Sequence, residues 1–349
     1  MRADYKIQGG KLVVADVETE DGLISRASIS GDFFLEPDEA LERINSSLTG
    51  LPANAGNERI AAAVNGALRE DDVLFGITAE GIAVAVRRAL GNASSWDDLE
   101  FEVIAGPTVS PTLNLALDQV LIDEIAAGRR GPMFRTWEWN APLLVIGSFQ
   151  SYDNEVNPEG VARHGITVSR RITGGGAMFM EPGNAITYSL YVPTSLVEGL
   201  SYVQAYAYLD EWVMGALAGI GVKARYVPLN DIASEEGKIG GAAQKRFSSG
   251  WLLHHVTMSY DIDAVKMLEC MRIGKEKLRG KGTASAAKRV DPMRSQTGMS
   301  REAIVDAFLA HFSGLYASRP ASLTEAELAA ARVLEQEKFL NPEWVHRVP

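Results

Sequence analysis

The sequence predicts an α+β fold, with a large domain built on a mixed or antiparallel sheet and a small α+β domain before it. Between residues 133 and 262, β-rich segments are separated by a helical stretch and by hairpin-like turns, which favours such a sheet. The length of 349 residues exceeds a typical single domain, which favours two. We expect a small accessory domain at 1–91, a polar and acidic linker at 92–103 and the large domain at 104–349.

The predicted accessory domain combines strands with short helices. Segments 11–17 and 24–35 are β-rich and partly alternating, so we expect two strands. Segment 36–51 predicts a helix, because its apolar residues recur at helical spacing between a proline and a glycine. Segments 57–70 and 79–91 predict two more helices. None of them carries a cluster of His, Cys or paired carboxylates, which indicates a helper domain.

The predicted large domain begins with an amphipathic helix at 112–128, whose leucines, valine and isoleucine share one side. A long helix is expected at 202–221. The segments that predict strands are 133–139, 142–150, 166–172, 185–193 and 250–262.

Composition excludes several classes of protein. The net charge of −11 argues against a main role on nucleic acid or on an anionic membrane. A single cysteine, Cys270, excludes an internal disulfide and a CxxC zinc site, and suits a reducing cytosol. No stretch approaches 18 apolar residues, and the start lacks a signal-peptide pattern, so we expect a cytoplasmic protein without a membrane span.

The segment 170–184, RRITGGGAMFMEPGN, concentrates positive charge and glycine. Glycine lets backbone N–H groups approach a ligand closely, and successive N–H groups form an anion-binding concavity. Arg170 and Arg171 would alternate faces, so we expect only one of them at the ligand. The alternative is an ordinary glycine-rich hairpin.

Two further segments combine glycine with positive charge. In 228–246, Asn230 and Asp231 suit a turn, and Lys238 follows seven residues after Asp231. A hairpin would bring these groups together, where the lysine fits a phosphate or a carboxylate; the alternative is an exposed lysine near a turn. The segment 276–290, EKLRGKGTASAAKRV, predicts a basic loop that closes over phosphates, or else a solvated charge run.

The chain lacks the common catalytic motifs: no Walker A loop, no HExxH and no GxSxG, and no GxGxxG between a strand and a helix. His254 and His255 are adjacent, but neighbours on a strand point to opposite faces, which disfavours a shared metal ion. We expect one histidine to face a pocket and the other to be packed or solvated.

Together these segments resemble the lipoate–protein ligase family, within the wider biotin/lipoate ligase group. NLALDQVL, LVIGSFQS and EKFLNPEW extend the resemblance from about residue 104 to the end. The motifs that carry it, in family order, are RRITGGGAMF at 170–179, GN at 183–184, ND at 230–231, KIGGAAQ at 238–244, HH at 254–255 and KGTASAAKRV at 281–290.

The resemblance implies a catalytic domain of the biotin/lipoate ligase type and an ATP-dependent reaction in two steps. Lipoate would form lipoyl-AMP, and a lysine of an acceptor carrier protein would then take the lipoyl group. Lys238 would be catalytic, bridging the acyl carbonyl and the α-phosphate, and Asp231 would hold Mg²⁺, unless Asn230 and Asp231 fix the lysine or the ribose. The implied binding residues are Arg171, Gly174, Gly175, Gly176, Ala177, Met178, Phe179, Asn184, Asn230, Asp231, Lys238, Ile239, Gly241, Ala243, His255, Lys281 and Ser285.

The resemblance also implies a basic loop at 275–289 that covers the adenylate, and an apolar acyl tunnel walled by Leu144, Val145 and Met178. The acceptor would be a lipoyl domain, a glycine-cleavage carrier or a more specialised carrier. Residues 1–91 resemble the family's accessory domain, which in many members lies at the C-terminus or on a separate chain.

The chain departs from the family's pattern at Met180, Glu181, Gly240, Ala242 and Val256, which border the expected acyl pocket. These departures affect the expected substrate preference and acceptor choice.

Two alternatives remain at this point. An octanoyl or lipoyl transferase of the same superfamily can use a cysteine nucleophile, but Cys270 lies in a helical stretch outside the glycine motifs. A homologue that only binds lipoyl domains would have no need of Lys238. Biotin ligases carry a Gly-Arg-Gly-Arg motif that this chain lacks.

Overall fold

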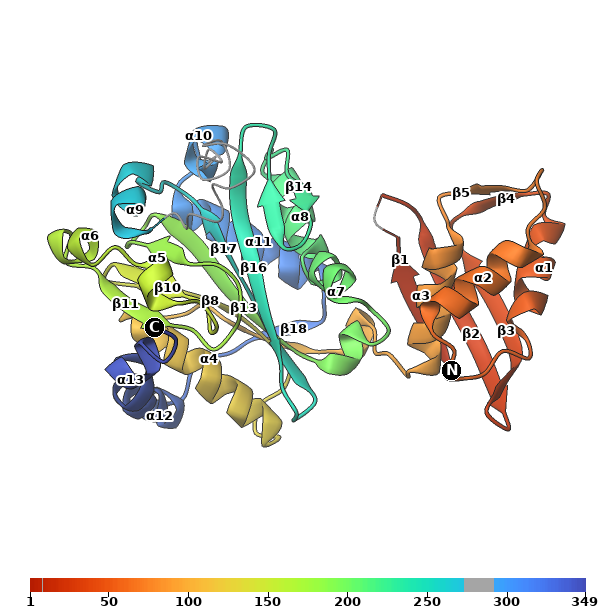
Figure 1. The fold of residues 1–349 in the computed structure, drawn as a ribbon, viewed down its shortest axis with the longest axis horizontal. Coiled ribbons are helices and arrows are strands. Elements are labelled where there is room, and N and C mark those ends of the chain that lie inside the picture. The colour runs from red at the N-terminus through yellow and green to blue at the C-terminus, as the bar shows by residue number, and fades with distance from the viewer. Residues whose placement is uncertain (8, 273–291) are drawn as a thin grey trace. The chain divides into compact units, whose positions relative to one another are not determined.

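The computed structural model describes residues 1–7, 9–272 and 292–349 (Figure 1). Contacts between Cα atoms divide the chain into two compact units. The first contains Met1–Asp98 and Thr194–Ala207, and the second contains Leu99–Pro193 and Tyr208–Pro349. The range expected to be a linker is divided between them, and its end enters a strand of the second unit. The assignment of 1–91 as an accessory domain stays a prediction.

The first unit is an antiparallel sheet with strand order β1-β2-β3, and helices α1 and α3 pack against this sheet (Figure 1). The helix α2 packs on both of these helices, and β4 and β5 form a separate ribbon. Of the apolar residues at helical spacing in α1, Ala40, Ile44 and Leu48 are buried, and Leu41 is partly exposed. The elements are β1 (Arg2–Lys6), β2 (Leu12–Glu20), β3 (Leu23–Gly31), β4 (Phe34–Glu36), α1 (Glu39–Leu48), α2 (Asn57–Ala67), β5 (Val73–Phe75), α3 (Ala79–Leu90) and the short helices η1 (Trp96–Asp98) and η2 (Thr194–Val197).

A buried arginine joins the separate parts of the first unit. The guanidinium of Arg88, on α3, donates hydrogen bonds to the carbonyl oxygens of Asp4, Ser94, Leu196 and Glu198 at 2.9–3.2 Å. Two of these acceptors belong to the segment 194–207, which therefore completes the unit from far along the sequence.

Within the described residues, the second unit is built on an eight-stranded sheet of order β14-β15-β16-β17-β13-β8-β6-β18. The sheet is mixed, because β6 pairs in parallel with β8 and β18 while the other neighbours are antiparallel. The second unit also contains a smaller three-stranded sheet of order β11-β10-β12. The strands are β6 (Phe101–Ile104), β7 (Thr108–Val109), β8 (Met133–Thr136), β9 (Glu138–Trp139), β10 (Leu143–Ile146), β11 (Thr167–Arg170), β12 (Met178–Met180), β13 (Ala185–Pro193), β14 (Arg225–Val227), β15 (Asp231–Ala233), β16 (Lys238–Arg246), β17 (Trp251–Ser259) and β18 (Ser318–Pro320).

Helices α4 and α12 pack together, and α4 also contacts β17. Ser110 caps the start of α4 by accepting a hydrogen bond from the Leu113 amide, and Pro111 occupies its first turn, where a missing N–H costs nothing. The helices of the second unit are α4 (Pro111–Ala126), α5 (Tyr152–Glu155), α6 (Pro158–Arg163), α8 (Glu211–Gly219), α9 (Ala264–Cys270), α10 (Met293–Thr297), α11 (Arg301–Leu315), α12 (Glu325–Leu334), η3 (Glu335–Phe339, a π-helix) and α13 (Pro342–Val345). The helix α7 (Tyr202–Leu209) begins in the first unit and ends in the second.

An aromatic cluster packs α8 and α11 against the sheet. The indole of Trp212 lies edge-on to Phe134 with ring centroids 5.1 Å apart, and Phe134 stacks on Phe312 at 4.4 Å. Such aromatic pairs add to the free energy gained by burying their area. The cluster packs against β8, which pairs with β13, and Thr187 of β13 lines the functional site described below.

The predicted fold class is confirmed, with a large mixed sheet and a small α+β unit. The predicted helix 202–221 is wrong in one respect, because it is two helices separated at Asp210. The buried Asp210 carboxylate accepts a hydrogen bond from Nε2 of His254 at 2.6 Å. None of the helices in the described ranges has the length and apolarity that crossing a membrane requires.

Candidate active site

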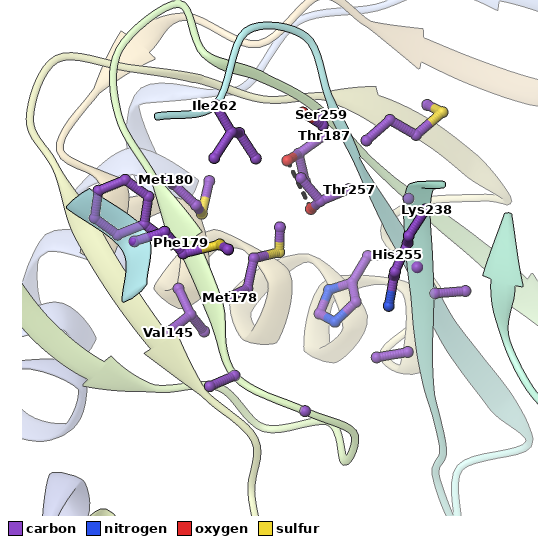
Figure 2. Close-up of a pocket in the computed structure, with 18 of the residues that line it drawn as sticks. Val145, Met178, Phe179, Met180, Thr187, Lys238, His255, Thr257, Ser259 and Ile262 are labelled. Atoms are coloured by element: carbon purple, nitrogen blue, oxygen red, sulfur yellow. Dashed lines mark hydrogen bonds between the residues drawn. The ribbon is translucent and has the colours of Figure 1, made fainter. Parts of the chain in front are cut away.

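A cavity of about 500 Å³ opens in the second unit between the two sheets (Figure 2). One wall comes from β10, β12 and the segment 174–177, which we call the glycine loop. Another wall comes from β15, β16 and β17. The volume lies within the range of small-molecule sites. The lining combines charged groups with apolar side chains, so the cavity suits a ligand that has an anionic and an apolar part.

Lys238 and Asp231 form an ion pair in the cavity wall, with 2.7 Å between Nζ and Oδ1. The pair arises because β15 and β16 are antiparallel neighbours, which returns the chain to Asp231 after the turn at 234–237. The lysine side chain is 42% exposed, so its ammonium group can reach a ligand. Asn230 fixes the start of β15, because its Nδ2 donates a 2.6 Å hydrogen bond to the Ala242 carbonyl. The predicted proximity of Asn230, Asp231 and Lys238 is confirmed.

Arg171 shapes the glycine loop. Its Nε donates to the hydroxyl of Thr173 at 3.0 Å, and its Nη2 donates to the carbonyl of Gly176 at 2.9 Å. Gly175 has φ +92°, and a Cβ there would lie 2.8 Å from Nη2 of Arg171, so this position requires glycine. The guanidinium lines the cavity while it orders the loop whose amides we expected at the ligand.

Arg170 points away from the cavity, as strand alternation predicted. It is fully buried and donates hydrogen bonds to backbone carbonyls of the C-terminal segment and of the turn after β10. The two adjacent arginines therefore have different roles: Arg170 ties the C-terminal segment to β11, and Arg171 faces the site.

His255 is the histidine that faces the cavity (Figure 2). The side chain of His254 is fully buried and does not line the cavity. Nδ1 of His255 lies 3.0 Å from Oδ2 of Asp118, and its Nε2 lies 2.7 Å from the Thr173 hydroxyl. Burial lowers the pKa of His255, so the ring is neutral at pH 7. Because a carboxylate only accepts, Nδ1 carries the proton and Nε2 accepts from Thr173. The chain Asp118–His255–Thr173–Arg171 thus connects helix α4 to the glycine loop.

Asp118 anchors this chain. Burial acts to raise its pKa, but the hydrogen bond from His255 and the charge of Arg135 hold the pKa below its ordinary value. The carboxylate also accepts hydrogen bonds from Ser189 and Tyr191, at 2.8 and 2.7 Å. The buried charge is therefore balanced by Arg135, 2.7 Å away, and by three neutral donors.

The apolar wall includes Val145, Met178 and Met180 (Figure 2), and it is extended by Met267 and Met271 of the α9 region. Methionines adapt their shape readily, which suits a flexible ligand chain. An ion pair between Lys266 and Glu181 ties α9 to the residue after β12.

Leu144, which we expected in the acyl tunnel, packs instead in a separate core behind β10. Strand alternation gives the physical reason, because Val145 takes the cavity side of β10 and its neighbour takes the other. Cys270 lies in the same core and is fully buried.

The structure brings most of the predicted site residues to one cavity. Asn184 is an exception: its Oδ1 accepts from the Glu181 amide and so closes the turn after β12. Gly174 and Gly175 lie in the loop beside the cavity, without lining it, and Lys281 and Ser285 lie outside the described residues. The predicted residues that line the cavity are Arg171, Gly176, Ala177, Met178, Phe179, Asn230, Asp231, Lys238, Ile239, Gly241, Ala243 and His255.

Sequence reasoning missed Asp118 and Thr173, which contact His255, and Trp137, which lines the cavity. The signal for Asp118 was its position four residues after Asn114, among the leucines of this helix, where both polar residues are buried. A buried acid predicts a partner, but the sequence alone does not identify His255 as that partner.

Among the described residues, no group of three or more His, Cys, Asp or Glu side chains could hold a metal ion. The cavity lining includes two carboxylate residues, Glu155 and Asp231. So few protein ligands fit Mg²⁺ that is held mainly by phosphate oxygens and water, and do not fit a metal bound by the protein alone.

Comparisons with known proteins agree on one family. A sequence model described as the lipoyl protein ligase A/B catalytic domain matches residues 110–313. A probable lipoate-protein ligase A of Mycoplasma pneumoniae is 28% identical over 69% of this chain and 70% of its own length. An octanoyltransferase LipM of Lysinibacillus sphaericus is 28% identical over 67% of this chain and 94% of its own. A solved chain, from a study of a bi-partite lipoate protein ligase and its E2 lipoyl domain of Thermoplasma acidophilum, superposes with a TM-score of 0.62 and 25% identity. That match covers 72% of this chain and 98% of the other.

Proposed function

The chain belongs to the lipoyl protein ligase A/B family, and from this premise we propose that it is an ATP-dependent lipoate–protein ligase. In the first step, a carboxylate oxygen of lipoate attacks the α-phosphorus of ATP, and pyrophosphate leaves with formation of lipoyl-AMP. In the second step, the neutral ε-amine of an acceptor lysine attacks the lipoyl carbonyl. AMP leaves, and the amine loses a proton as the amide forms.

The first step brings an anionic carboxylate to an anionic phosphate, so it requires fixed positive charge and directed hydrogen-bond donors. Lys238 supplies a charge in the cavity wall, and the loop ordered by Arg171 supplies backbone N–H groups. The apolar wall near Val145 and Met178 suits the hydrocarbon chain of lipoate. Asp231 is the residue that we assign to Mg²⁺, which would neutralise phosphate charge when bound.

One observation carries the choice of ligase over cysteine-dependent transferase: the cavity offers a reachable lysine and no reachable thiol. Lys238 is 42% exposed, whereas Cys270, the single cysteine of the sequence, is 0% exposed. Burial also raises the pKa of Cys270, which disfavours the thiolate that a thioester route needs. The names of the two relatives quoted above cover both reactions, so this contrast decides our proposal.

The partner that we propose is a lipoyl-acceptor carrier, because the solved ligase from Thermoplasma acidophilum was studied with an E2 lipoyl domain. Transfer to a lipoyl domain and to a glycine-cleavage carrier, each assayed directly, distinguishes the two candidate acceptors.

Lipoate-dependent exchange between ATP and labelled pyrophosphate tests the first step. We expect exchange in wild type and a loss of at least about a hundredfold in Lys238→Met, since the variant lacks the charge that stabilises the transition state. Cys270→Ala should retain both exchange and transfer. The exposed Lys223, in the turn between α8 and β14, provides a matched control as Lys223→Met.

The opposite pattern would support the transferase instead. Acyl transfer that proceeds without ATP and disappears in Cys270→Ala would contradict the ligase proposal. So would a Lys238→Met protein with wild-type exchange.

A further inference from the structure

A cluster of cations and aromatic rings lies on the second unit, outside the cavity. We call it the cationic patch and define it as Phe149, Lys245, Phe247, Lys338, Trp344 and Arg347. Its residues come from three distant segments: the turn after β10, the outer end of β16 with the turn that follows, and the C-terminal η3–α13 region.

The cations of the patch stack on its rings. Nζ of Lys338 and Cζ of Arg347 lie 4.2 and 4.1 Å from the centroid of the Trp344 ring. Arg347 also lies 5.8 Å from the ring of Phe149, which is 80% exposed. Cation–π contacts account for the stacking, but the large aromatic side chain of Phe149 remains in water.

The cations are close enough to disfavour one another. Burial and the charge of Arg347 lower the pKa of Lys245, and burial together with the charges of Lys245 and Arg347 lowers the pKa of Lys338. The exposed Asp123 is the carboxylate that offsets part of this charge. Three cations beside one carboxylate leave local positive charge on a chain whose net charge is −11.

The patch adjoins the glycine end of the cavity. Arg347 donates to the carbonyl of Ser148, and the Ser148 amide donates to the Thr173 carbonyl at 2.8 Å, next to the glycine loop. Lys245 follows Ala243, which lines the cavity, by two residues of β16, a distance of about 7 Å along the strand. A molecule seated on the patch would therefore lie beside the site where we place the activated acyl group.

We propose that the cationic patch is the docking surface for the acceptor carrier, and that it binds an acidic face of the carrier beside the lysine to be lipoylated. This inference rests on the proposed function. An acidic carrier is repelled by most of a chain with this net charge and attracted at the patch, so the patch orients it. The exposed ring of Phe149 supplies apolar contact at the centre of such an interface.

The two half-reactions separate docking from chemistry. Lipoyl-AMP formation is measured by pyrophosphate exchange, and its reactivity by trapping with hydroxylamine, a nucleophile too small to need docking. Transfer is measured with the isolated apo lipoyl domain of a 2-oxoacid dehydrogenase as the acceptor. We use the double variant Lys245→Glu with Lys338→Glu, the single variant Phe149→Ala, and Lys223→Glu as the control of equal charge change per site.

We expect the double variant to raise the KM for the lipoyl domain about tenfold or more, in line with the effect of electrostatic steering. Exchange and hydroxylamine trapping should stay within twofold of wild type. High salt should bring the wild-type KM toward that of the variant. Phe149→Ala should raise the same KM, and because the side chain is exposed, it should not alter folding. Lys223→Glu should behave as wild type.

An unchanged KM for the lipoyl domain in both patch variants would overturn the proposal. Equal losses of hydroxylamine trapping and of transfer to the lipoyl domain would also overturn it. If wild type bound a single-stranded RNA oligonucleotide and the double variant did not, while the KM for the lipoyl domain stayed unchanged, the patch would be assigned to nucleic acid instead. If wild type showed no exchange, the proposed function would fail. Docking would then be tested without ATP, by fluorescence anisotropy of the labelled apo domain against wild type and the double variant.

Discussion

The hydroxyl of Thr173 links two functional side chains, so Thr173→Val tests whether the chain from Asp118 to Arg171 positions the glycine loop. Valine preserves the shape of the side chain and removes the 2.7 Å contact with His255 and the 3.0 Å bond from Arg171. A neutral hydrogen bond contributes about 1 kcal/mol and one to a charged group about 1.5–3 kcal/mol. We therefore expect the free energy of unfolding to fall by about 2–4 kcal/mol.

The same substitution should weaken catalysis, because Arg171 loses one of the contacts that fix its guanidinium. If about 1.4 kcal/mol of transition-state stabilisation depends on that contact, kcat/KM for lipoate in pyrophosphate exchange falls about tenfold. Urea unfolding followed by tryptophan fluorescence gives the stability term. Thr136→Val is the control, since that buried hydroxyl accepts only a 3.3 Å bond from the Gly106 amide and lies outside the cavity lining. Equal losses of exchange in the two variants, or none in Thr173→Val, would refute the positioning role.

Three further predictions concern the buried polar groups. Asp118→Asn should lower the free energy of unfolding by about 3–5 kcal/mol at pH 7, because it leaves Arg135 buried without its counter-charge. The pKa of Asp118 is held below its ordinary value against the effect of burial, by His255 and then Arg135. The contribution of the ionised Asp118 to the free energy of unfolding is therefore complete at neutral pH and is lost as the pH falls below about 4. Urea unfolding should show that the difference in free energy of unfolding between wild type and Asp118→Asn is smaller at pH 3 than at pH 7. A larger difference at pH 3 would contradict this prediction. Because Cys270 is buried and burial raises its pKa, Ellman's reagent should label the native thiol at least about a hundredfold more slowly than the unfolded chain; comparable absorbance kinetics would contradict this. Arg88→Met should destabilise the first unit by about 3 kcal/mol, seen as faster amide hydrogen exchange in β1 and α3, whereas unchanged protection there would show that its four hydrogen bonds are dispensable.

Local features of the sequence were sufficient to predict much of the site. The Asn230–Asp231 turn and Lys238 lie within one short hairpin, in which Lys238 pairs with Ala233, two residues from Asp231, so the two side chains stay close. The different fates of Arg170 and Arg171 also follow from a local rule, because neighbouring side chains on a strand alternate.

The remaining features depend on contacts between distant parts of the chain. Asp118 and His255 are 137 residues apart, and no local pattern identifies one as the partner of the other. Asn184 carries a family motif, yet it closes a turn in place of lining the cavity. The split of the helix at 202–221 is likewise tertiary, since Asp210 meets His254 on a distant strand. Periodicity predicts which face of an element is buried, but not what covers it.

The composition of the first unit has a consequence for any attempt to divide the protein. The chain passes between the units at residues 98/99, 193/194 and 207/208, so a single cut at 98/99 does not separate them into complete parts. The N-terminal fragment would carry the Arg88 guanidinium without the Leu196 and Glu198 carbonyls that accept its hydrogen bonds, and the other fragment would carry those carbonyls on a loop without its core. The C-terminal fragment would contain the whole second unit together with the segment 194–207, which the N-terminal fragment lacks. Fragments produced by that cut are therefore suited to reassemble as a complementing heterodimer, in which the segment 194–207 completes the first unit.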